Sequence, residues 1–198
     1  GVGLIVTGGI SVNRRGWLLP AGGTMNTRAD ALNHRRVTTA VHDQGGRIVM
    51  QLMHAGRYAY HPFGESASAV KSRINPFTPR AMTTARVWQV VDDFARAARL
   101  AREAGYDGVE VMGSEGYLIN QFICARTNHR DDDWGGSFAN RSRFPVEIVR
   151  RIREALAEGR DLDRSEVVRV VPEHRLVRRR NDGGDVRPDP FVTLAHLV

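Results

Sequence analysis

The sequence is poor in cysteine and lysine and contains no long hydrophobic run. Cys124 is the only cysteine among 198 residues, which excludes an internal disulfide and any metal or iron–sulfur centre built from several cysteines. The longest apolar runs, such as residues 3–6, fall short of the roughly 18 residues that a membrane-spanning helix needs. The first residues lack the basic and apolar regions of a signal peptide. We therefore expect a protein of the reducing cytoplasm with no membrane partner.

The scarcity of lysine changes how the net charge of +7 is interpreted. Lys71 is the only lysine, and the other basic residues are arginines spread along the chain. The densest basic run, 178–180, is followed by Asp182 and Asp185. Nucleic-acid binding requires basic residues gathered on one face or along one groove. A basic nucleic-acid-binding protein is therefore an alternative that the arginine distribution disfavours.

The composition is otherwise that of a globular domain, with 41% hydrophobic and 26% charged residues. Such a chain can bury a core and is neither a disordered tail nor a disulfide scaffold. Short apolar runs bounded by glycines predict strands that alternate with helices. The predicted strands are residues 3–9, 46–54, 107–113 and 167–171.

The predicted helices are recognised by their apolar spacing and by the residues at their ends. One helix should begin at Thr83 or Thr84 and end at Gly105, because Val87, Val91, Phe94, Ala98 and Ala101 recur at helical intervals. Another is expected over residues 27–43, with Leu32, Val37 and Val41 on its buried stripe and glycines 45 and 46 after it. A third begins near Asn140 and includes Leu156, and residues 58–82 form a long irregular stretch.

Strands joined by helical crossovers predict an α/β fold with a parallel sheet. An open doubly wound sheet would carry a glycine fingerprint of the G-x-G-x-x-G type after a strand, and residues 113–116 match it poorly. Polar residues instead follow each strand, which is where a (β/α)₈ barrel builds its site. The sequence therefore favours a TIM-barrel type of fold.

Four residues near these strand ends could bind a ligand or give it a proton. Gly9 would let the backbone approach a flat ring closely, and the amide of Gln51 could read the edge of a heteroaromatic ring. The phenol of Tyr117 keeps its proton at neutral pH and can give it to a developing carbanion. Arg126 could hold an anionic or carbonyl oxygen through its fork of donors.

Two segments resemble the old yellow enzyme family of flavin-dependent oxidoreductases. Residues 51–57, QLMHAGR, are similar to the family's QLxHxGR segment, and residues 105–144 are similar to its most recognisable block. Within that block, residues 108–120, GVEVMGSEGYLIN, resemble the bacterial 2,4-dienoyl-CoA reductase branch most closely. The likeness runs from Gly1 to about Leu156.

The resemblance implies a (β/α)₈ barrel that binds FMN, accepts hydride from NAD(P)H and reduces a conjugated C=C bond. It implies that Tyr117 protonates the substrate and that Gln51 and Gly9 contact the flavin. It also implies that Arg126 aligns with an arginine that is associated with substrate in the reductase branch of the family.

The resemblance also bears on the substrate. Simple enone reductases of the family carry a histidine, with an asparagine or second histidine, at two places where this chain has Met112 and Glu115. These two residues favour an enoyl or dienoyl thioester, a small molecule, as the substrate.

The likeness is partial, and this leads to further expectations. Gly1 falls at the family's second strand and the motifs end near Ala157, which predicts an incomplete barrel of about strands 2–5 over residues 1–158. Residues 159–198 would form a divergent tail, and the iron–sulfur cluster of dienoyl-CoA reductases cannot be held by one cysteine. Open sheet edges would favour self-association. A catalytically inactive, truncated remnant of such an enzyme is the main alternative to an active one.

Overall fold

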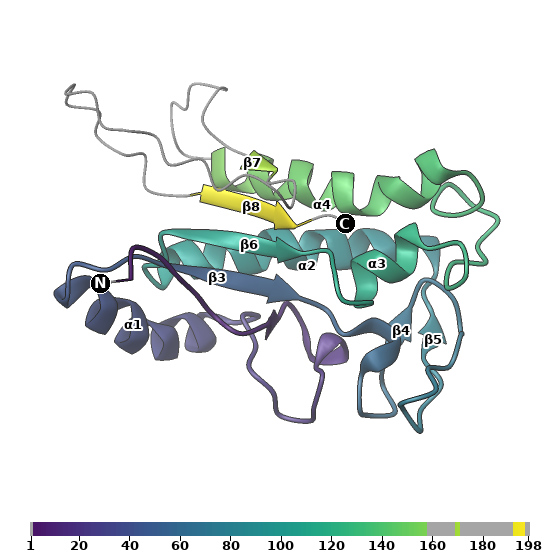
Figure 1. Cartoon of the computed structure of the whole chain (residues 1–198), viewed down its shortest axis with the longest axis horizontal. Helices are drawn as coiled ribbons and strands as arrows, with labels where there is room; N and C mark the ends of the chain where they lie inside the picture. The colour runs from purple at the N-terminus through teal and green to yellow at the C-terminus, as the bar shows by residue number, and fades with distance from the viewer. Residues whose placement is uncertain (1, 158–168, 171–191, 197–198) are drawn as a thin grey trace.

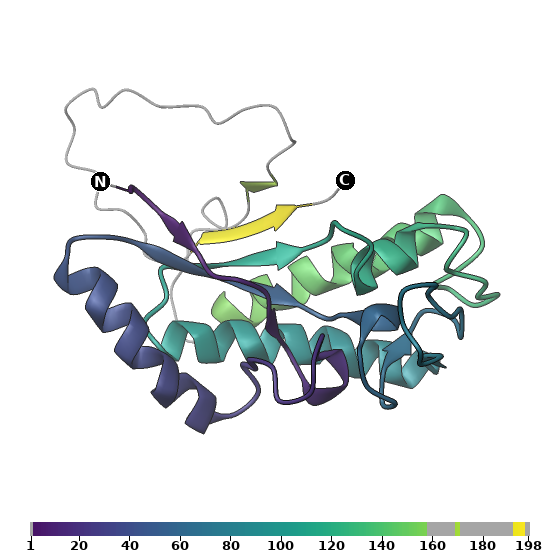
Figure 2. The same ribbon diagram turned by 60° about the horizontal axis from the view of Figure 1, so that its bottom comes forward.

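In the computed structural model of the chain, the described residues are 2–157, 169–170 and 192–196. They form a parallel sheet with helices on one side (Figures 1 and 2). The strand order is β1-β3-β6-β8-β7, and β2 also pairs with β3. The strands are β1 (Ile5–Val6), β2 (Ile10–Ser11), β3 (Ile48–Met53), β6 (Gly108–Met112), β7 (Arg169–Val170) and β8 (Val192–His196).

Three long helices cover one face of this sheet (Figure 2). They are α1 (Arg28–Asp43), α2 (Thr84–Glu103) and α4 (Phe138–Ala157). Beyond the carboxyl ends of β3 and β6 lie the short elements η2 (Gly56–Tyr58), β4 (Glu65–Ser66), β5 (Arg80–Ala81) and α3 (Leu118–Ile123). A further 3₁₀ turn, η1 (Arg14–Gly16), follows β2. A doubly wound sheet carries helices on both faces, whereas the long helices described here lie on one face of a parallel sheet, in agreement with the predicted barrel-type architecture.

The first predicted strand differs from expectation in two ways. Within the predicted run over residues 3–9 only Ile5–Val6 forms a strand, and a second short strand follows at Ile10–Ser11, so Gly9 lies between two strands. Val6 pairs with Val49 and Ile10 with Leu52, so the first segment carries one more residue than β3 over the same span. Moreover, Ile5 and Val6 are exposed, because β1 lies at the edge of the described sheet.

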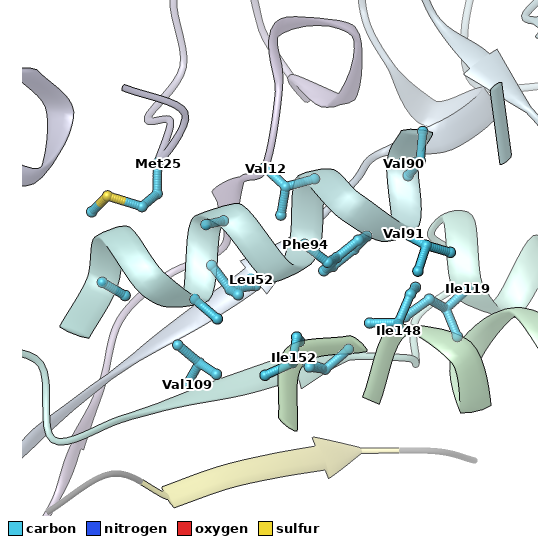
Figure 3. Close-up of a cluster of buried hydrophobic side chains, with 14 of the residues drawn as sticks. Val12, Met25, Leu52, Val90, Val91, Phe94, Val109, Ile119, Ile148 and Ile152 are labelled. Carbon is cyan, nitrogen blue, oxygen red and sulfur yellow. The ribbon is translucent and has the colours of Figure 1, made fainter. Parts of the chain in front are cut away.

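The main core lies between the sheet and helices α2 and α4 (Figure 3). Phe94 of α2 is fully buried there, against Leu52 of β3 and Val109 of β6 from the sheet and Ile152 from α4. All five residues whose spacing predicted α2 are buried, and Thr83 caps the helix by accepting a hydrogen bond from the backbone N–H of Arg86. Fully buried aliphatic and aromatic side chains of this kind stabilise a domain by about 1.5–3 kcal/mol each.

Helix α1 has the predicted length but buries a different face. Of the predicted stripe, Leu32 and Val37 are exposed and only Val41 packs against the core, whereas Ala31 and Thr38 are buried. Thr38 turns inward because its hydroxyl donates to the backbone oxygen of Ala104 at 2.6 Å, at the end of α2. A hydrogen bond to a distant backbone oxygen thus outweighs the local apolar spacing.

The remaining sequence predictions concern the loops and the carboxyl-terminal part. The stretch over residues 58–82 contains the paired strands β4 and β5, which were not predicted. Strand β7 lies inside the predicted strand at 167–171, and β8, not predicted, pairs with β6. The predicted boundary near residue 158 lies outside the described residues. In the described part of the chain, no helix combines the length and apolarity needed to cross a bilayer.

Candidate functional site

The carboxyl ends of β3 and β6 open into a cavity of about 390 Å³. Three of the four predicted site residues, Gly9, Gln51 and Tyr117, line it. They come from the β1–β2 connection, from the middle of β3 and from the residue before α3. The other lining residues are Ser11, Trp17, Leu18, Leu19, Gly22, Gly23, Met53, Met112 and Glu115. The fold therefore brings together residues that are more than 100 positions apart in the chain.

Gln51 faces away from the helices because side chains alternate along a strand. Its neighbours Met50 and Leu52 belong to the helix-backed core, whereas its own side chain is only partly buried. The Nε2 atom of Gln51 donates to Oε2 of Glu110 on the adjacent strand at 2.9 Å. This bond fixes the orientation of the amide and leaves Oε1 as its remaining acceptor.

Gly9 packs closely against the same two strand residues. A Cβ atom at this position would lie 2.3 Å from Sδ of Met53 and 3.4 Å from Oε1 of Gln51. A side chain at residue 9 would therefore displace Met53 and narrow the cavity beside the Gln51 amide. Glycine suits position 9 because there is no room for a side chain, and not because the backbone there has a positive φ.

Tyr117 is positioned by a tight turn of two left-handed residues. Glu115 has φ = 61° and Gly116 has φ = 78°, and a non-glycine residue in this region stores strain of order 1 kcal/mol. A Cβ on Gly116 would meet Oη of Tyr58 at 2.8 Å. Tyr58 packs edge-on against Tyr117, with 6.0 Å between ring centroids. The turn thus sets both tyrosines at the cavity wall.

The surroundings of Tyr117 favour the protonated phenol. Burial raises its pKa above the ordinary value, and the negative charge of Glu115 and the neighbouring Tyr58 raise it further. The phenol therefore carries its proton at neutral pH. It is available as a hydrogen-bond donor or a general acid at the cavity.

The loops around the site are joined by the buried side chain of Gln121 on α3. Its Oε1 accepts from the backbone N–H of Arg57 at 2.9 Å and from Oγ of Ser66 at 2.7 Å. Its Nε2 donates to the backbone oxygen of Gly116 at 2.7 Å. One amide thus connects η2, β4 and the turn that precedes Tyr117.

A second buried polar group lies beneath η2. His54 is fully buried, its Nδ1 accepts from the backbone N–H of Gly56, and burial lowers its pKa. The neutral ring therefore carries its proton on Nε2, which lies 3.7 Å from Oε1 of Glu65.

Glu65 is buried and ionised. Burial alone would raise its pKa, but the nearby His54 and the guanidinium of Arg86 lower it to about 2. Arg86 Nε donates to Oε1 at 2.8 Å, and Arg15 pairs with the other oxygen at 3.0 Å. Ion pairs of Glu65 therefore connect β4 to α2 and to the turn η1.

Arg126, the fourth predicted site residue, does not line the cavity with the other three. It lies on a second cavity of about 370 Å³, together with Arg57, Tyr58 and the segment 70–74. Tyr58 separates the two cavities, because it lines the second and packs against Tyr117 of the first. The predicted pairing of Arg126 with substrate would therefore take place beyond the two tyrosines.

Sequence reasoning missed Glu110 and Glu65, and it assigned no role to Gln121, one of the polar residues expected to converge at the strand ends. A signal for Glu110 was present, because a lone carboxylate in the middle of an apolar strand must face a polar environment or a partner. The role of Gln121 and the buried position of Glu65 had no such signal, since their partners lie on other loops of the fold. In the described residues, no three His, Cys, Asp or Glu side chains are grouped to hold a metal.

Comparison with known proteins gives one consistent result. A sequence model of the NADH:flavin oxidoreductase / NADH oxidase family matches residues 1–185, which extends past the point near residue 157 where the motifs were expected to end. A metal reductase of Desulforamulus reducens is 40% identical over 162 residues, covering 79% of this chain and 24% of the relative. Putative 12-oxophytodienoate reductase 4 of Oryza sativa is 37% identical over 158 residues, covering 74% of this chain and 42% of the relative.

The solved structure of morphinone reductase supports the same assignment. It superposes with a TM-score of 0.73 at 32% identity, over 76% of this chain and 46% of that protein. The chain spans less than half the length of these relatives.

Proposed function

The chain belongs to the NADH:flavin oxidoreductase / NADH oxidase family, and from that premise we propose that it contributes to FMN-dependent reduction of a conjugated C=C bond by NAD(P)H. The observation that carries the proposal is the convergence of Gly9, Gln51 and Tyr117 on one cavity. Membership of this family supports flavin and nicotinamide chemistry. The reduction of an alkene, and the roles of individual residues, are our proposal.

The first cavity suits the ring system of FMN. Gly9, Gly22 and Gly23 expose backbone along the cavity, and a Cβ at Gly9 would intrude on it. The oriented amide of Gln51 offers Oε1 to an N–H group at a ring edge. The described lining holds no cation for a phosphate, so these residues would hold the ring portion. Bound FMN would supply the hydride-transfer chemistry.

Tyr117 would supply the proton. Reduction of a C=C bond next to a carbonyl requires hydride at one carbon and a proton at the other. The phenol lies on the cavity wall, and its raised pKa keeps it protonated at neutral pH. A positioned general acid of this kind contributes about 10²- to 10⁴-fold to a rate.

We further propose that the substrate is a 2,4-dienoyl or enoyl thioester. The two lining residues that support this are Met112 and Glu115. A thioether and a carboxylate cannot donate hydrogen bonds to a carbonyl oxygen at neutral pH, as the histidine and asparagine of simple enone reductases do. The acyl group would then be held by shape, and by contacts outside this cavity.

The proposal is tested by separating flavin binding from proton donation. The full chain is titrated with FMN and flavin fluorescence is followed, for the unchanged protein, Gln51→Leu and Tyr117→Phe. We expect Gln51→Leu to weaken FMN binding and Tyr117→Phe to leave it unchanged. If the unchanged chain shows neither quenching nor visible flavin absorption after reconstitution, this chain is not itself a flavoprotein and the proposal fails.

A second measurement tests the reaction. The FMN-loaded chain is reduced with NADH or NADPH without oxygen and then mixed with a 2,4-dienoyl thioester. Tyr117→Phe should slow flavin reoxidation by the thioester about 100-fold or more while leaving reduction by the nicotinamide unchanged. Equal reoxidation rates in the variant and the unchanged chain would remove Tyr117 from the role of acid.

A further inference from the structure

The second cavity gathers positive charge. Four cationic residues, Arg57, Lys71, Arg73 and Arg126, line it together with Tyr58, Val70, Ser72 and Ile74. Among the described residues that line it there is no carboxylate. Lys71 is the only lysine of the whole chain. We propose that this cavity is an anion-binding subsite that takes a phosphate group of the ligand whose reactive end lies at Tyr117.

The four cations are not neutralised within the described part of the chain. None of their side chains forms an ion pair or donates a hydrogen bond there, whereas Arg86, Arg96 and Arg130 all hold carboxylates. The Nε atom of Arg57 is buried without any hydrogen-bond partner. A buried donor left unpaired is destabilising, and an anion entering the cavity would supply the missing acceptor.

Two of the cations are presented by an anchored loop. Ser72 and Asn75 are buried, and Nδ2 of Asn75 donates to the backbone oxygen of Ala59 at 2.7 Å. Lys71 and Arg73 flank the buried Ser72 and are themselves exposed. The loop is thus fixed on its inner side while its charges face the cavity mouth.

The chemistry of these groups selects phosphate. Arginine forks pair with two oxygens of a phosphate at once, and lysine adds a point charge. Several like charges around about 370 Å³ repel one another, and a doubly charged phosphate group relieves that repulsion more than a single carboxylate does. A cavity lined by one sign of charge also raises the local concentration of the opposite ion.

The position of the cavity links it to the reacting end. Tyr58 forms part of its wall, the guanidinium of Arg57 lies 5.4 Å from the Tyr58 ring centre, and that ring packs on Tyr117. A ligand that reaches both cavities must therefore pass the tyrosine pair and be extended. Two extended ligands of the proposed reaction carry phosphate, namely the nicotinamide donor and a coenzyme A thioester, so this inference rests on the proposed function.

The test is binding of phosphate-bearing ligands by calorimetry at several salt concentrations. The full chain, with FMN added, is compared with a Arg73→Glu/Arg126→Glu double variant and with Arg36→Glu, an exposed arginine of α1 that serves as the control. Both substituted residues of the double variant are exposed, and circular dichroism checks that each variant is folded. We expect the double variant to lose at least about tenfold in affinity and to show a shallower salt dependence, and Arg36→Glu to do neither.

Ligand pairs distinguish the two sources of phosphate. Loss of a preference for NADPH over NADH in the double variant would assign the subsite to the nicotinamide donor, and loss of a preference for coenzyme A over pantetheine would assign it to the thioester. Arg73→Lys/Arg126→Lys should retain most of the affinity. Unchanged affinity of the Glu double variant for all four ligands would overturn the inference.

FMN binding is scored separately by flavin fluorescence. If FMN does not bind but the phosphate-dependent affinity persists, the proposed function fails and the subsite stands. If FMN binds and the double variant behaves like Arg36→Glu, the subsite fails and the proposed function stands.

Discussion

The two sides of helix α2 are stabilised by different forces. Toward α4 and the sheet, Phe94 and its neighbours form a layer of aliphatic and aromatic side chains (Figure 3). Toward the loops, the same helix supplies Arg86, which pairs with the buried Glu65, and Asp93, which accepts from Asn13 at 2.6 Å. The apolar layer supplies bulk stability, whereas the charged layer fixes loops in one arrangement around the cavities. Damage to the apolar layer should therefore appear in the free energy of unfolding, and damage to the charged layer in how that free energy depends on pH.

The largest effect is expected from the apolar layer. Phe94→Ala should lower the free energy of unfolding by about 3–5 kcal/mol, because it removes buried apolar surface and leaves a void. Urea denaturation followed by circular dichroism measures the change. Leu32→Ala is the control, because Leu32 is 59% exposed and should shift stability by no more than about 0.5 kcal/mol. Similar losses from both variants would contradict the assignment of the core.

The stability that the charged layer contributes should depend on pH. The pKa of Glu65 is about 2 in the folded chain against 4.5 ordinarily. Its contribution to stability is therefore fully present above pH 4.5 and is lost as the pH falls from there toward 2. The loss attributable to this group is about 3 kcal/mol.

Glu65→Gln is the matched variant for this pH dependence. It should be less stable at neutral pH, because Arg86 and Arg15 lose their charged partner, and its stability should fall less steeply below pH 4.5. Urea denaturation at several pH values gives both quantities. Parallel curves for the variant and the unchanged chain would show that Glu65 does not carry the effect.

A smaller effect is expected at the turn before Tyr117. Gly116→Ala should cost about 1–2 kcal/mol for the left-handed backbone, and its Cβ should also push Tyr58 away from Tyr117. Gly136→Ala is the control, since Gly136 also has a positive φ of 71° but nothing lies within 4 Å of an added Cβ. Tyrosine ring signals in NMR spectra should move in the first variant only. Movement in both would mean that the contact with Tyr58 is unimportant.

The smallest expected effect is electrostatic. Glu115→Gln removes a negative charge that raises the pKa of Tyr117, so the phenol should titrate at a lower pH with little change in stability. NMR titration of ¹³C-labelled tyrosine measures this shift. Glu103→Gln, at the exposed end of α2, should leave the titration unchanged. An unaltered Tyr117 titration in Glu115→Gln would show that Glu115 does not contribute to the raised pKa.

The apolar layer could be predicted from the sequence more fully than the charged one. The spacing from Val87 to Ala101 identified α2 and its buried face, because helical periodicity is a local property. Thr83 and Gly105 marked its ends for the same reason, and Gly105 has the positive φ of 88° typical of a helix terminus. The buried face predicted for α1 was wrong at Leu32 and Val37. The hydrogen bond from Thr38 to Ala104 joins two segments that are distant in the sequence, so local spacing does not reveal it.

The candidate site also has a part that the sequence predicts and a part that it does not. Gly9, Gln51 and Tyr117 were placed together correctly, because the carboxyl ends of parallel strands meet at one edge. Arg126 was grouped with them, but the structure separates it by the pair Tyr58 and Tyr117. Which side of a loop faces which cavity depends on long-range contacts such as those of Gln121, and a sequence does not display these.

The alternation along β3 has a consequence for how such a chain can change over evolutionary time. Loss or gain of a single codon within β3 would exchange the neighbours Gln51 and Leu52, placing a polar amide in the apolar layer and an isobutyl group in the cavity. One mutation would then damage stability and chemistry together. The additional residue between β1 and β2 is accommodated at an edge strand with exposed side chains. Length variation among related chains should accordingly concentrate at that edge and be absent from β3 and β6, and sequencing surviving clones from a codon-insertion library would measure this directly.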